Sequence, residues 1–299
     1  MNDGAVARRA QPLWLRAGPA IFLLLWSGGF VFLKLGLRDA DPLTFLALRY
    51  ACVVGILALP WLWLRPALPG TPAAWCHLAM VGLLVQAGYF AFTYLSLKAG
   101  MSAGAVALIT SQQPILVGLL APALAGERVD RVRWLGLALG AGGAATVIVA
   151  QSSIEVATPL ALLFALLALA AMTAGTLWEK RFGTDVHPVT ANLVQYAVAL
   201  AVTAPLAFLL EPMHVAWTPE LLGSLAYLVI GNSIVAITLL LAMIRHGEAS
   251  RVSALFFLVP PMTTLIALAV LDEPVPWLAW PGMLLAAAGL YLVMRRSAG

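Results

Sequence analysis

The stretch Leu43–Leu64, LTFLALRYACVVGILALPWLWL, contains one charged residue, Arg49, among its 22 residues. About 20 apolar residues in a helix span the hydrocarbon core of a bilayer, so this stretch predicts a transmembrane helix. A related stretch, Val189–Leu210, VTANLVQYAVALAVTAPLAFLL, follows at an offset of 146 residues. Within this pair Thr44, Tyr50 and Ala51 match Thr190, Tyr196 and Ala197. The two stretches therefore predict a membrane protein with an internal repeat.

Ten apolar stretches of this kind follow one another, joined by short links with turn-forming residues. They are Pro19–Leu33, Leu43–Leu64, Trp75–Leu97, Met101–Ala125, Trp134–Ala150, Ala157–Leu177, Val189–Leu210, Leu221–Ile244, Val252–Leu271 and Trp277–Met294. The chain of 299 residues is 62% hydrophobic and 10% charged, whereas soluble domains carry about 25% charged residues. A chain this poor in charge cannot cover a water-facing surface. The sequence therefore predicts an all-α polytopic membrane protein of ten transmembrane helices, without a separate catalytic domain.

The repeat extends along the chain and divides it into two five-helix halves, residues 1–153 and 154–299. Further matched pairs, at offsets of 146 or 147 residues, are Gly100 and Gly247, Pro114 and Pro261, Glu127 and Glu273, and Trp134 and Trp280. Because five is an odd number, the second half must enter the membrane from the opposite side. Inverted halves of this kind place a substrate site between them near the middle of the membrane, and alternating access arises from them.

Lysine and arginine are distributed unequally between the two sides of the predicted membrane. With ten helices, 13 of them fall on the side of the termini and 3 on the other side, with Arg49 inside the membrane. Loops rich in Lys and Arg stay in the cytoplasm, so both termini are predicted to be cytoplasmic, in a bacterial inner membrane. The net charge of +4 comes from clusters between apolar runs. This is not the pattern of a nucleic-acid-binding face, and no nucleic-acid partner is expected.

Two helices carry prolines near their centres, Pro114 in the fourth and Pro260 with Pro261 in the ninth. A proline inside a helix removes one backbone hydrogen bond and clashes with the preceding turn. In lipid the freed carbonyl needs a partner, so such a break faces a cavity or another helix. We expect the three prolines to act as hinges. The polar residues before the first break contact substrate or bond between helices; they are Thr110, Ser111, Gln112 and Gln113.

The third helix carries a face that is both aromatic and polar. At 100° per residue, four residues fall within an arc of about 100°; they are Gln86, Tyr89, Phe90 and Thr93. Tyr89 lies too deep for the interfacial aromatic belt, so this face lines a cavity or packs within the bundle. The repeat places Asn232 and Ser233 near the position of Gln86. Further candidates for substrate binding are Trp26, Trp178 and Phe256.

Arg49 is the one charged residue inside the ten stretches, and charges within a membrane are usually functional. Two interpretations stay open: the side chain extends outward to pair with Asp39 or Asp41, or it contacts a substrate carboxylate. No Asp or Glu lies within a stretch, so no carboxylate is placed to carry protons. Neither the two cysteines nor the four histidines have metal-site spacing,. We expect no metal, no cofactor and no catalytic residue.

The glycines Gly136 and Gly140 have the GxxxG spacing that lets two helices approach closely,. Together with the features above, they resemble the EamA-type members of the drug/metabolite transporter superfamily. The resemblance rests on a proline in each fourth helix, then Gly126-Glu127 or Asp272-Glu273, then a glycine-rich fifth helix beginning near Trp134 or Trp280. The string TSQQP at 110–114 and the aromatic interior are similar to the YddG-like bacterial exporters of aromatic and neutral amino acids.

The resemblance implies a ten-helix bundle that exports metabolites through a central cavity between the repeats. The expected function is therefore export of small metabolites, aromatic or neutral amino acids first among them, by alternating access. The expected partners are a small-molecule substrate and the lipid bilayer, with a monomer favoured and a dimer left open. Two alternatives stay open: a facilitator for another small metabolite, such as a sugar, nucleoside or drug-like compound, and a membrane scaffold that transports nothing.

Overall fold

The computed structural model describes residues 13–101, 106, 109–127, 129–151, 158–183, 185–247, 249–272 and 275–295. Almost all of these residues are helical, apart from turns, loops and an isolated bridge between Ala40 and Val215. Eight helical segments are long and apolar enough to cross a membrane, and Gln113–Leu124 and Ala279–Met294 are shorter apolar helices. These ten segments coincide with the ten predicted stretches, which confirms the all-α polytopic fold.

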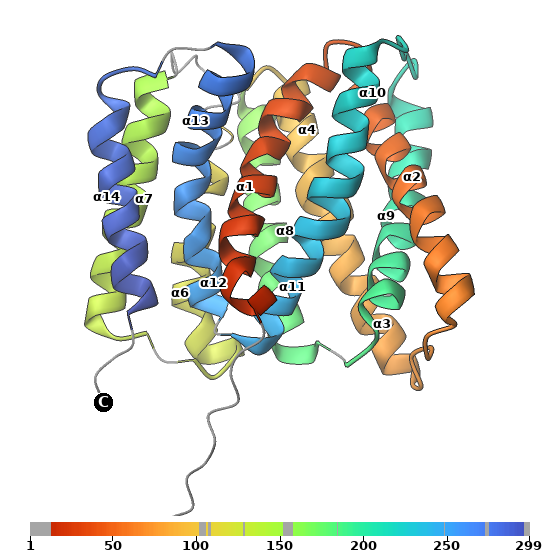
Figure 1. Cartoon of the computed structure of the whole chain (residues 1–299), viewed down its shortest axis with the longest axis horizontal. Helices are drawn as coiled ribbons and strands as arrows, with labels where there is room; N and C mark the ends of the chain where they lie inside the picture. The colour runs from red at the N-terminus through yellow and green to blue at the C-terminus, as the bar shows by residue number, and fades with distance from the viewer. Residues whose placement is uncertain are drawn as a thin grey trace, which may run out of the picture.

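The elements of the first half follow in chain order (Figure 1). They are α1 (Leu13–Gly36), α2 (Pro42–Leu64), α3 (Pro72–Val81), the π-helix η1 (Gly82–Tyr89), α4 (Phe90–Lys98), α6 (Gln113–Leu124) and α7 (Arg131–Gln151). Those of the second half are α8 (Pro159–Phe182), α9 (Pro188–Leu210), α10 (Pro219–Ala226), the π-helix η2 (Tyr227–Ala236), α11 (Ile237–His246), α12 (Ala249–Ala254), the 3₁₀-helix η3 (Leu255–Leu258), α13 (Val259–Leu271) and α14 (Ala279–Met294). The third crossing is thus α3–η1–α4, and the eighth is α10–η2–α11.

In the described part of the chain, five crossings begin in the same way, with a proline in the first turn of their first helix. The prolines are Pro42, Pro72, Pro159, Pro188 and Pro219. Proline suits this position because the N–H it lacks would have no acceptor within the helix. Before three of these helices a threonine hydroxyl accepts a hydrogen bond from a first-turn N–H, at Thr71, Thr158 and Thr218,. Short loops therefore determine where these crossings begin.

The two halves are inverted relative to one another. The backbone N–H of Asp41 donates to the carbonyl of His214 at 3.1 Å, and that of Ala216 donates to the carbonyl of Asp39 at 2.7 Å. These bonds join the loop after the first crossing to the loop after the seventh, so both lie at the same end of the bundle. The repeat matches the loop after the first crossing with the loop after the sixth. The loops after the sixth and seventh crossings lie at opposite ends of α9, so the two matched loops lie at opposite ends of the bundle.

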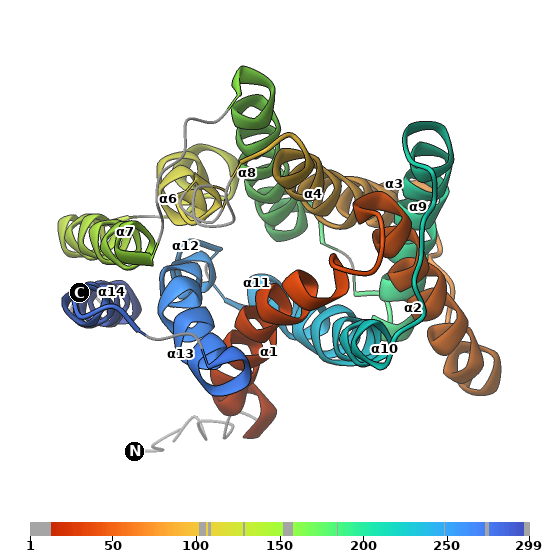
Figure 2. The ribbon, with the colours of Figure 1, turned by 90° about the horizontal axis from the view of Figure 1, so that it is seen from above.

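Two pairs of repeat-related helices stand at opposite sides of the molecule (Figures 1 and 2). Viewed from above, α7 packs against α14 at one side and α2 against α9 at the other. Glycines make the first pair close: a Cβ built on Gly143 would lie 2.6 Å from the carbonyl oxygen of Gly282, and one on Gly136 would lie 2.8 Å from that of Gly289. The predicted close packing at Gly136 is confirmed, and its partner is the matching helix of the other half.

The predicted breaks are present in the fourth and ninth crossings, although the prolines do not sit in the middle of a helix. Pro114 lies in the first turn of α6, after a turn at 111–112. Pro260 and Pro261 lie in the first turn of α13, after η3. A proline in the first turn of a helix removes no intrahelical hydrogen bond. The fourth and ninth crossings are therefore each interrupted at a point where one helical segment ends and the next begins. The action of the prolines as hinges stays a prediction.

Candidate functional site

Among the described residues each half contains one π-helix, and the two π-helices occupy matching positions of the repeat. A shift of 146 residues carries η1 onto residues 228–235, inside η2. A π-helix widens the backbone, and such segments occur frequently at functional sites. Buried carbonyls there need other donors: the hydroxyl of Tyr50 donates to the carbonyl of Gln86 at 2.5 Å, and that of Tyr196 donates to the carbonyl of Ser233 at 2.9 Å.

Tyr50 and Tyr196 are themselves matched by the repeat, and their rings touch, with centroids 5.5 Å apart. Tyr50 projects from α2 of the first half and Tyr196 from α9 of the second. Each holds the π-helix of its own half. The pseudo-two-fold axis that relates the two halves therefore passes near this ring pair, close to the two π-helices.

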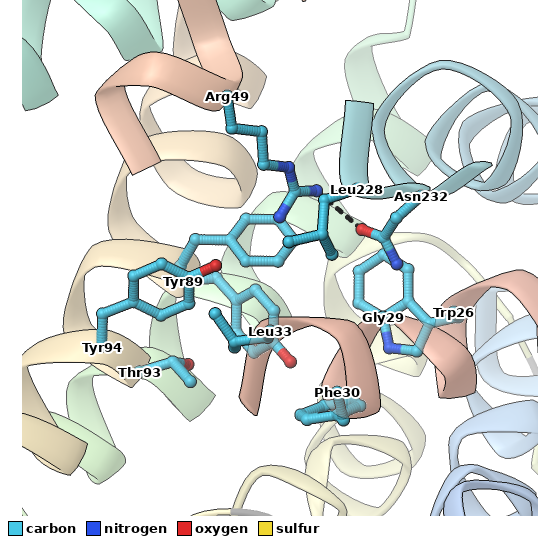
Figure 3. A pocket seen from close by; sticks show the side chains of 11 residues that line it. Trp26, Gly29, Phe30, Leu33, Arg49, Tyr89, Thr93, Tyr94, Leu228 and Asn232 are labelled. Atoms are coloured by element: carbon cyan, nitrogen blue, oxygen red, sulfur yellow. Dashed lines mark hydrogen bonds between the residues drawn. The ribbon is translucent and has the colours of Figure 1, made fainter. Parts of the chain in front are cut away.

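A pocket lies beside the π-helices and takes its lining from both halves (Figure 3). The lining residues are Trp26, Gly29, Phe30, Leu33, Arg49, Tyr89, Phe90, Thr93, Tyr94, Leu228 and Asn232. They belong to the second half of α1, the beginning of α2, the end of the third crossing and η2. The pocket thus lies between the middle of the bundle and the end at which α1 finishes. It leaves about 20 Å³, which is room for roughly one water molecule,.

The rings around the pocket form one cluster centred on Trp26. The ring centroids of Phe22, Phe256, Phe90 and Tyr89 lie 5.4, 5.5, 5.9 and 6.2 Å from that of Trp26. These separations are typical of favourable aromatic pairs. Phe22 and Phe256 also touch each other, at 5.7 Å, but neither lines the pocket. The cluster therefore links the pocket to η3, next to the break of the ninth crossing.

Arg49 crosses from α2 to η2 of the other half. Its side chain is buried, its Nε donates to Ser233 Oγ at 2.7 Å, and its Nη2 donates to Asn232 Oδ1 at 2.6 Å. The guanidinium carbon also lies 4.6 Å from the centre of the Phe90 ring, a cation–π contact,. Arg49 thus joins the two halves at the wall of the pocket.

The suggested pairing of Arg49 with Asp39 or Asp41 is wrong. Asp39 accepts a hydrogen bond from the Thr218 hydroxyl at 2.6 Å, and Asp41 accepts one from the backbone N–H of His214 at 2.9 Å. The side chain of Arg49 points inward because the neutral acceptors of η2 lie within its reach. The loop aspartates instead hold the loop between α9 and α10.

Of the residues predicted to bind substrate, five line the pocket: Trp26, Tyr89, Phe90, Thr93 and Asn232. Ser233 lies behind them and accepts from Arg49, while Phe256 packs on Trp26. Gln86 lies on the same helix as Tyr89 but is fully buried outside the lining. Its two amide side-chain atoms have no hydrogen-bond partner among the described residues.

The residues before Pro114 belong to a different place. Gln113 Nε2 donates to Thr176 Oγ1 and to Ser253 Oγ, both at 3.2 Å, and so ties α6 to α8 and α12. The hydroxyl of Thr110 donates to the carbonyl of Val106 at 2.9 Å, and Gln112 Nε2 donates to Ser111 Oγ at 3.3 Å. None of these residues lines the pocket.

Trp178 also lies apart from the pocket. Its ring packs on those of His77 and Phe182, with centroids 5.7 and 4.6 Å away. His77 belongs to α3, the first segment of the third crossing, and Phe182 to the end of α8, so this cluster lies toward the opposite end of the bundle from the pocket. Trp178, a further candidate from the sequence, therefore does not line this pocket.

The lining residues that sequence reasoning missed are Gly29, Phe30, Leu33, Tyr94 and Leu228. Three of them lie on α1 with Trp26, spaced by three or four residues, which is the pattern of one helix face. That pattern was available in the sequence. Gly29 has a further role, because a Cβ there would lie 2.5 Å from Asn232 Nδ2. It lets α1 approach η2 closely.

The expectation that no carboxylate lies within a crossing is wrong for Glu179. The helix α8 runs to Phe182, beyond the predicted end at Leu177. Glu179 is buried there and pairs with Arg245. The helix continues because its last turn bonds to neighbours: Lys180 Nζ donates to the carbonyl of Gly247, and Arg181 Nη1 to that of Leu124.

Two other buried carboxylates cap helix starts across the repeat interface. Glu127 accepts from the backbone N–H groups of Ala249 and Ser250 at the start of α12. Glu211 accepts from Leu43 N at 2.9 Å and Thr44 N at 2.8 Å at the start of α2. A carboxylate is stabilised at a helix N-terminus by the free N–H groups and the helix dipole. Within the described ranges, no group of three or more His, Cys, Asp or Glu residues could hold a metal ion.

The chain is similar to known proteins over most of its length. A probable amino-acid metabolite efflux pump of Salmonella typhimurium is 27% identical over 288 residues, which cover 91% of this chain and 92% of that protein. An uncharacterized transporter of Archaeoglobus fulgidus is 26% identical over 284 residues, which cover 91% and 94%. A protein of known crystal structure, 19% identical, has the same fold, with a TM-score of 0.79 over 94% of this chain and 96% of that one.

The sequence model of one family matches the chain twice, at residues 19–149 and 159–295, so that each half is one copy of the family's repeat. The two matches lie in the two halves that the fold relates by inversion. This chain therefore belongs to the EamA-like transporter family.

Proposed function

We propose that this membrane transporter exports small neutral or aromatic amino acids across the bacterial inner membrane, by alternating access at the pocket between its halves. One observation carries the proposal: a single pocket, lined from both halves, combines the rings of Trp26, Tyr89 and Phe90 with the cation of Arg49. Rings suit an apolar side chain, and a guanidinium suits a carboxylate. The relative from Salmonella typhimurium named as a probable amino-acid metabolite efflux pump supports the same substrate class.

The inverted fold supports alternating access. In an inverted repeat, exchanging the conformations of the two halves turns a site open to one side into a site open to the other. The pocket has room for roughly one water (about 20 Å³), so an amino acid needs the rings to move before it fits,. The 3₁₀ segment η3 and the turn at 111–112 are places where the ninth and fourth crossings can bend.

Hydrogen bonds join the two halves at both ends of the bundle. At the end where α8 finishes, Glu127 caps α12. At the other end, Glu211 caps α2, and Thr218 bonds to Asp39. The transport cycle we propose breaks one set of these bonds at a time, so that the pocket never opens to both sides.

Counterflow in proteoliposomes tests the proposal. Vesicles with purified protein are loaded with unlabelled L-phenylalanine, L-leucine, glucose or uridine, and entry of the labelled compound is followed against protein-free vesicles. We expect counterflow with the amino acids. Counterflow with glucose or uridine alone would overturn the amino-acid assignment and leave transport standing. Vesicles that accumulate none of the four would point to a scaffold, and the proposal would fail.

A further inference from the structure

Arg49 is a buried charge whose hydrogen-bond partners are all neutral. It bonds to Ser233 and Asn232, and it lies over the ring of Phe90. Among the described residues that line the pocket there is no Asp or Glu. Burying a cation without a counter-ion is costly, because neutral dipoles replace only part of its hydration. The pocket therefore carries a local positive charge that a bound anion would compensate.

The guanidinium has donors left for such an anion. Arginine presents five N–H donors in a planar fork that matches the two oxygens of a carboxylate. The hydrogen bonds to Ser233 and Asn232 use two of them, and the neutral hydroxyls of Tyr94 and Tyr196 also lie near the guanidinium. Arg49 lines the pocket together with Tyr89 and Phe90, and its guanidinium carbon lies 4.6 Å from the centre of the Phe90 ring; Figure 3 shows its hydrogen bond to Asn232 at the pocket wall. A molecule with a carboxylate at Arg49 would place its apolar part among these rings.

The internal repeat provides a comparison within the same chain. Gln195 occupies the position in α9 that Arg49 occupies in α2, and it is equally buried. A buried neutral side chain is therefore compatible with this position of the fold. A positive charge at this position therefore belongs to the first half alone, and it lies at the wall of the pocket.

We propose that Arg49 binds the carboxylate of the transported molecule, and that the substrates are small monocarboxylates with an apolar side chain, zwitterionic amino acids included. This proposal rests on the proposed transport function and specifies which chemical group of the substrate the site binds. The carboxylate, rather than the amino group, then contributes most to recognition. The Thr93 hydroxyl, which belongs to the pocket lining and has no hydrogen-bond partner among the described residues, is available to the amino group.

Competition in the counterflow assay tests this assignment on the unaltered protein. For L-phenylalanine and L-leucine, three competitors are compared: the free amino acid, its carboxamide, and the acid that lacks the amino group, 3-phenylpropanoate or 4-methylpentanoate. We expect the two carboxylates to compete and the carboxamide to be weaker by about tenfold to a hundredfold, the value of one charged hydrogen-bonded contact. Equal competition by carboxamide and free acid would overturn the assignment, while transport itself would stand.

Two variants locate the effect at Arg49. Arg49→Gln should abolish the difference between free acid and carboxamide, and Arg49→Lys should keep part of it because the charge remains. Gln195→Met, at the matching position, is the control and should keep the full difference. Each variant is first checked for a monodisperse peak in detergent. If Arg49→Gln does not fold, the competition series on the unaltered protein still decides the proposal. An Arg49→Gln protein that folds and keeps the difference would refute the role of Arg49.

Discussion

At the scale of single residues, Gln86 and Arg49 show opposite ways of burying a polar group. Arg49 is bonded across the repeat interface, whereas the Gln86 side-chain amide has no hydrogen-bond partner among the described residues. A buried amide without partners costs about 1–3 kcal/mol. We expect a ligand or another conformation to use this amide. Gln86 lies three residues before Tyr89 in η1, and Tyr89 lines the pocket.

Replacing Gln86 by Met, which has a similar volume and no amide, tests this role. We expect Gln86→Met to leave thermal stability unchanged or to raise it by about 1 kcal/mol, because an unsatisfied amide is removed. We expect transport to fall at least tenfold, since the amide is used when substrate is bound. Melting in detergent and initial counterflow rates measure the two effects. A stable variant with normal transport would show that Gln86 only fills space.

Tyr89 offers a second test at the same scale. Its ring lines the pocket and lies 6.2 Å from Trp26. We expect Tyr89→Ala to lower transport strongly while the protein still inserts and stays monodisperse. Trp178→Ala, at the other end of the bundle, is the control and should leave the apparent affinity for substrate unchanged. Equal losses of affinity in both variants would argue against the described pocket as the substrate site.

At the scale of elements, the paired π-helices are the features that position the site. Each is held by a tyrosine of the neighbouring crossing of its own half, Tyr50 for η1 and Tyr196 for η2. Without these hydroxyls a buried carbonyl in each π-helix would lose a hydrogen-bond donor. The regular α-helical hydrogen-bond pattern would then compete with the π-helical one. The two tyrosines therefore stabilise the two π-helices, which contribute Tyr89 and Asn232 to the pocket lining.

Removing either hydroxyl should destabilise the protein by similar amounts. We expect Tyr50→Phe and Tyr196→Phe each to cost about 1–3 kcal/mol, because each leaves one buried carbonyl unpaired. Thermal melting in detergent measures the loss, and Tyr291→Phe, on an exposed ring of α14, is the control. An unchanged melting temperature in both variants would show that the π-helices do not depend on these bonds.

The packing of α7 on α14 gives a prediction with a control at the adjacent residue. A Cβ at Gly143 would lie 2.6 Å from the carbonyl oxygen of Gly282, which is backbone and cannot move aside. A Cβ at Gly142 would meet only Leu285 Cδ2, at 3.8 Å. We expect Gly143→Ala to lower the yield and melting temperature of folded protein, and Gly142→Ala to be neutral. Comparable yields would mean that the helix pair is looser than described.

At the scale of the whole molecule, orientation in the membrane is the first property to test. The beginning of α1 and the end of α14 lie at the same end of the bundle (Figure 1). The Lys and Arg count of 13 to 3 predicts that this end faces the cytoplasm,. In a protein with Cys52 and Cys76 changed to Ser, we expect Glu220→Cys to react with an impermeant maleimide in intact spheroplasts. Gly70→Cys should react only after permeabilisation, and the reverse result would invert the orientation.

Energy coupling is a second property of the whole molecule. No Asp or Glu is among the residues that line the pocket in the described part of the chain. Glu179, Glu127 and Glu211 lie at helix ends and are bonded there. We expect counterflow in liposomes to run without an imposed pH gradient. Strict dependence on such a gradient would contradict this, and Glu179→Gln would then show whether the buried carboxylate carries the proton.

Much of the fold follows from the sequence because it depends on local properties. The lengths of apolar stretches such as Leu43–Leu64 determine the crossings, since the bilayer selects for length and apolarity alone. An odd number of crossings in each half determines the inversion. Glycines spaced as in Gly136 and Gly140 determine a close helix pair, because only they lack a side chain at the contact. The aromatic face of the third crossing was likewise visible, from its helical period.

The tertiary structure alone decided which of the candidate side chains share one pocket. Arg49 bonds to residues 183 and 184 positions further along the chain, so its direction depends on how the halves dock. Tyr89 and Asn232 belong to the two π-helices and line the pocket, whereas Gln86, in the same π-helix as Tyr89, lies outside the lining. The helical period and the composition of a segment specify which side chains share one face of a helix. Which faces meet is set by packing between helices far apart in sequence, and by the hydrogen bonds that hold them.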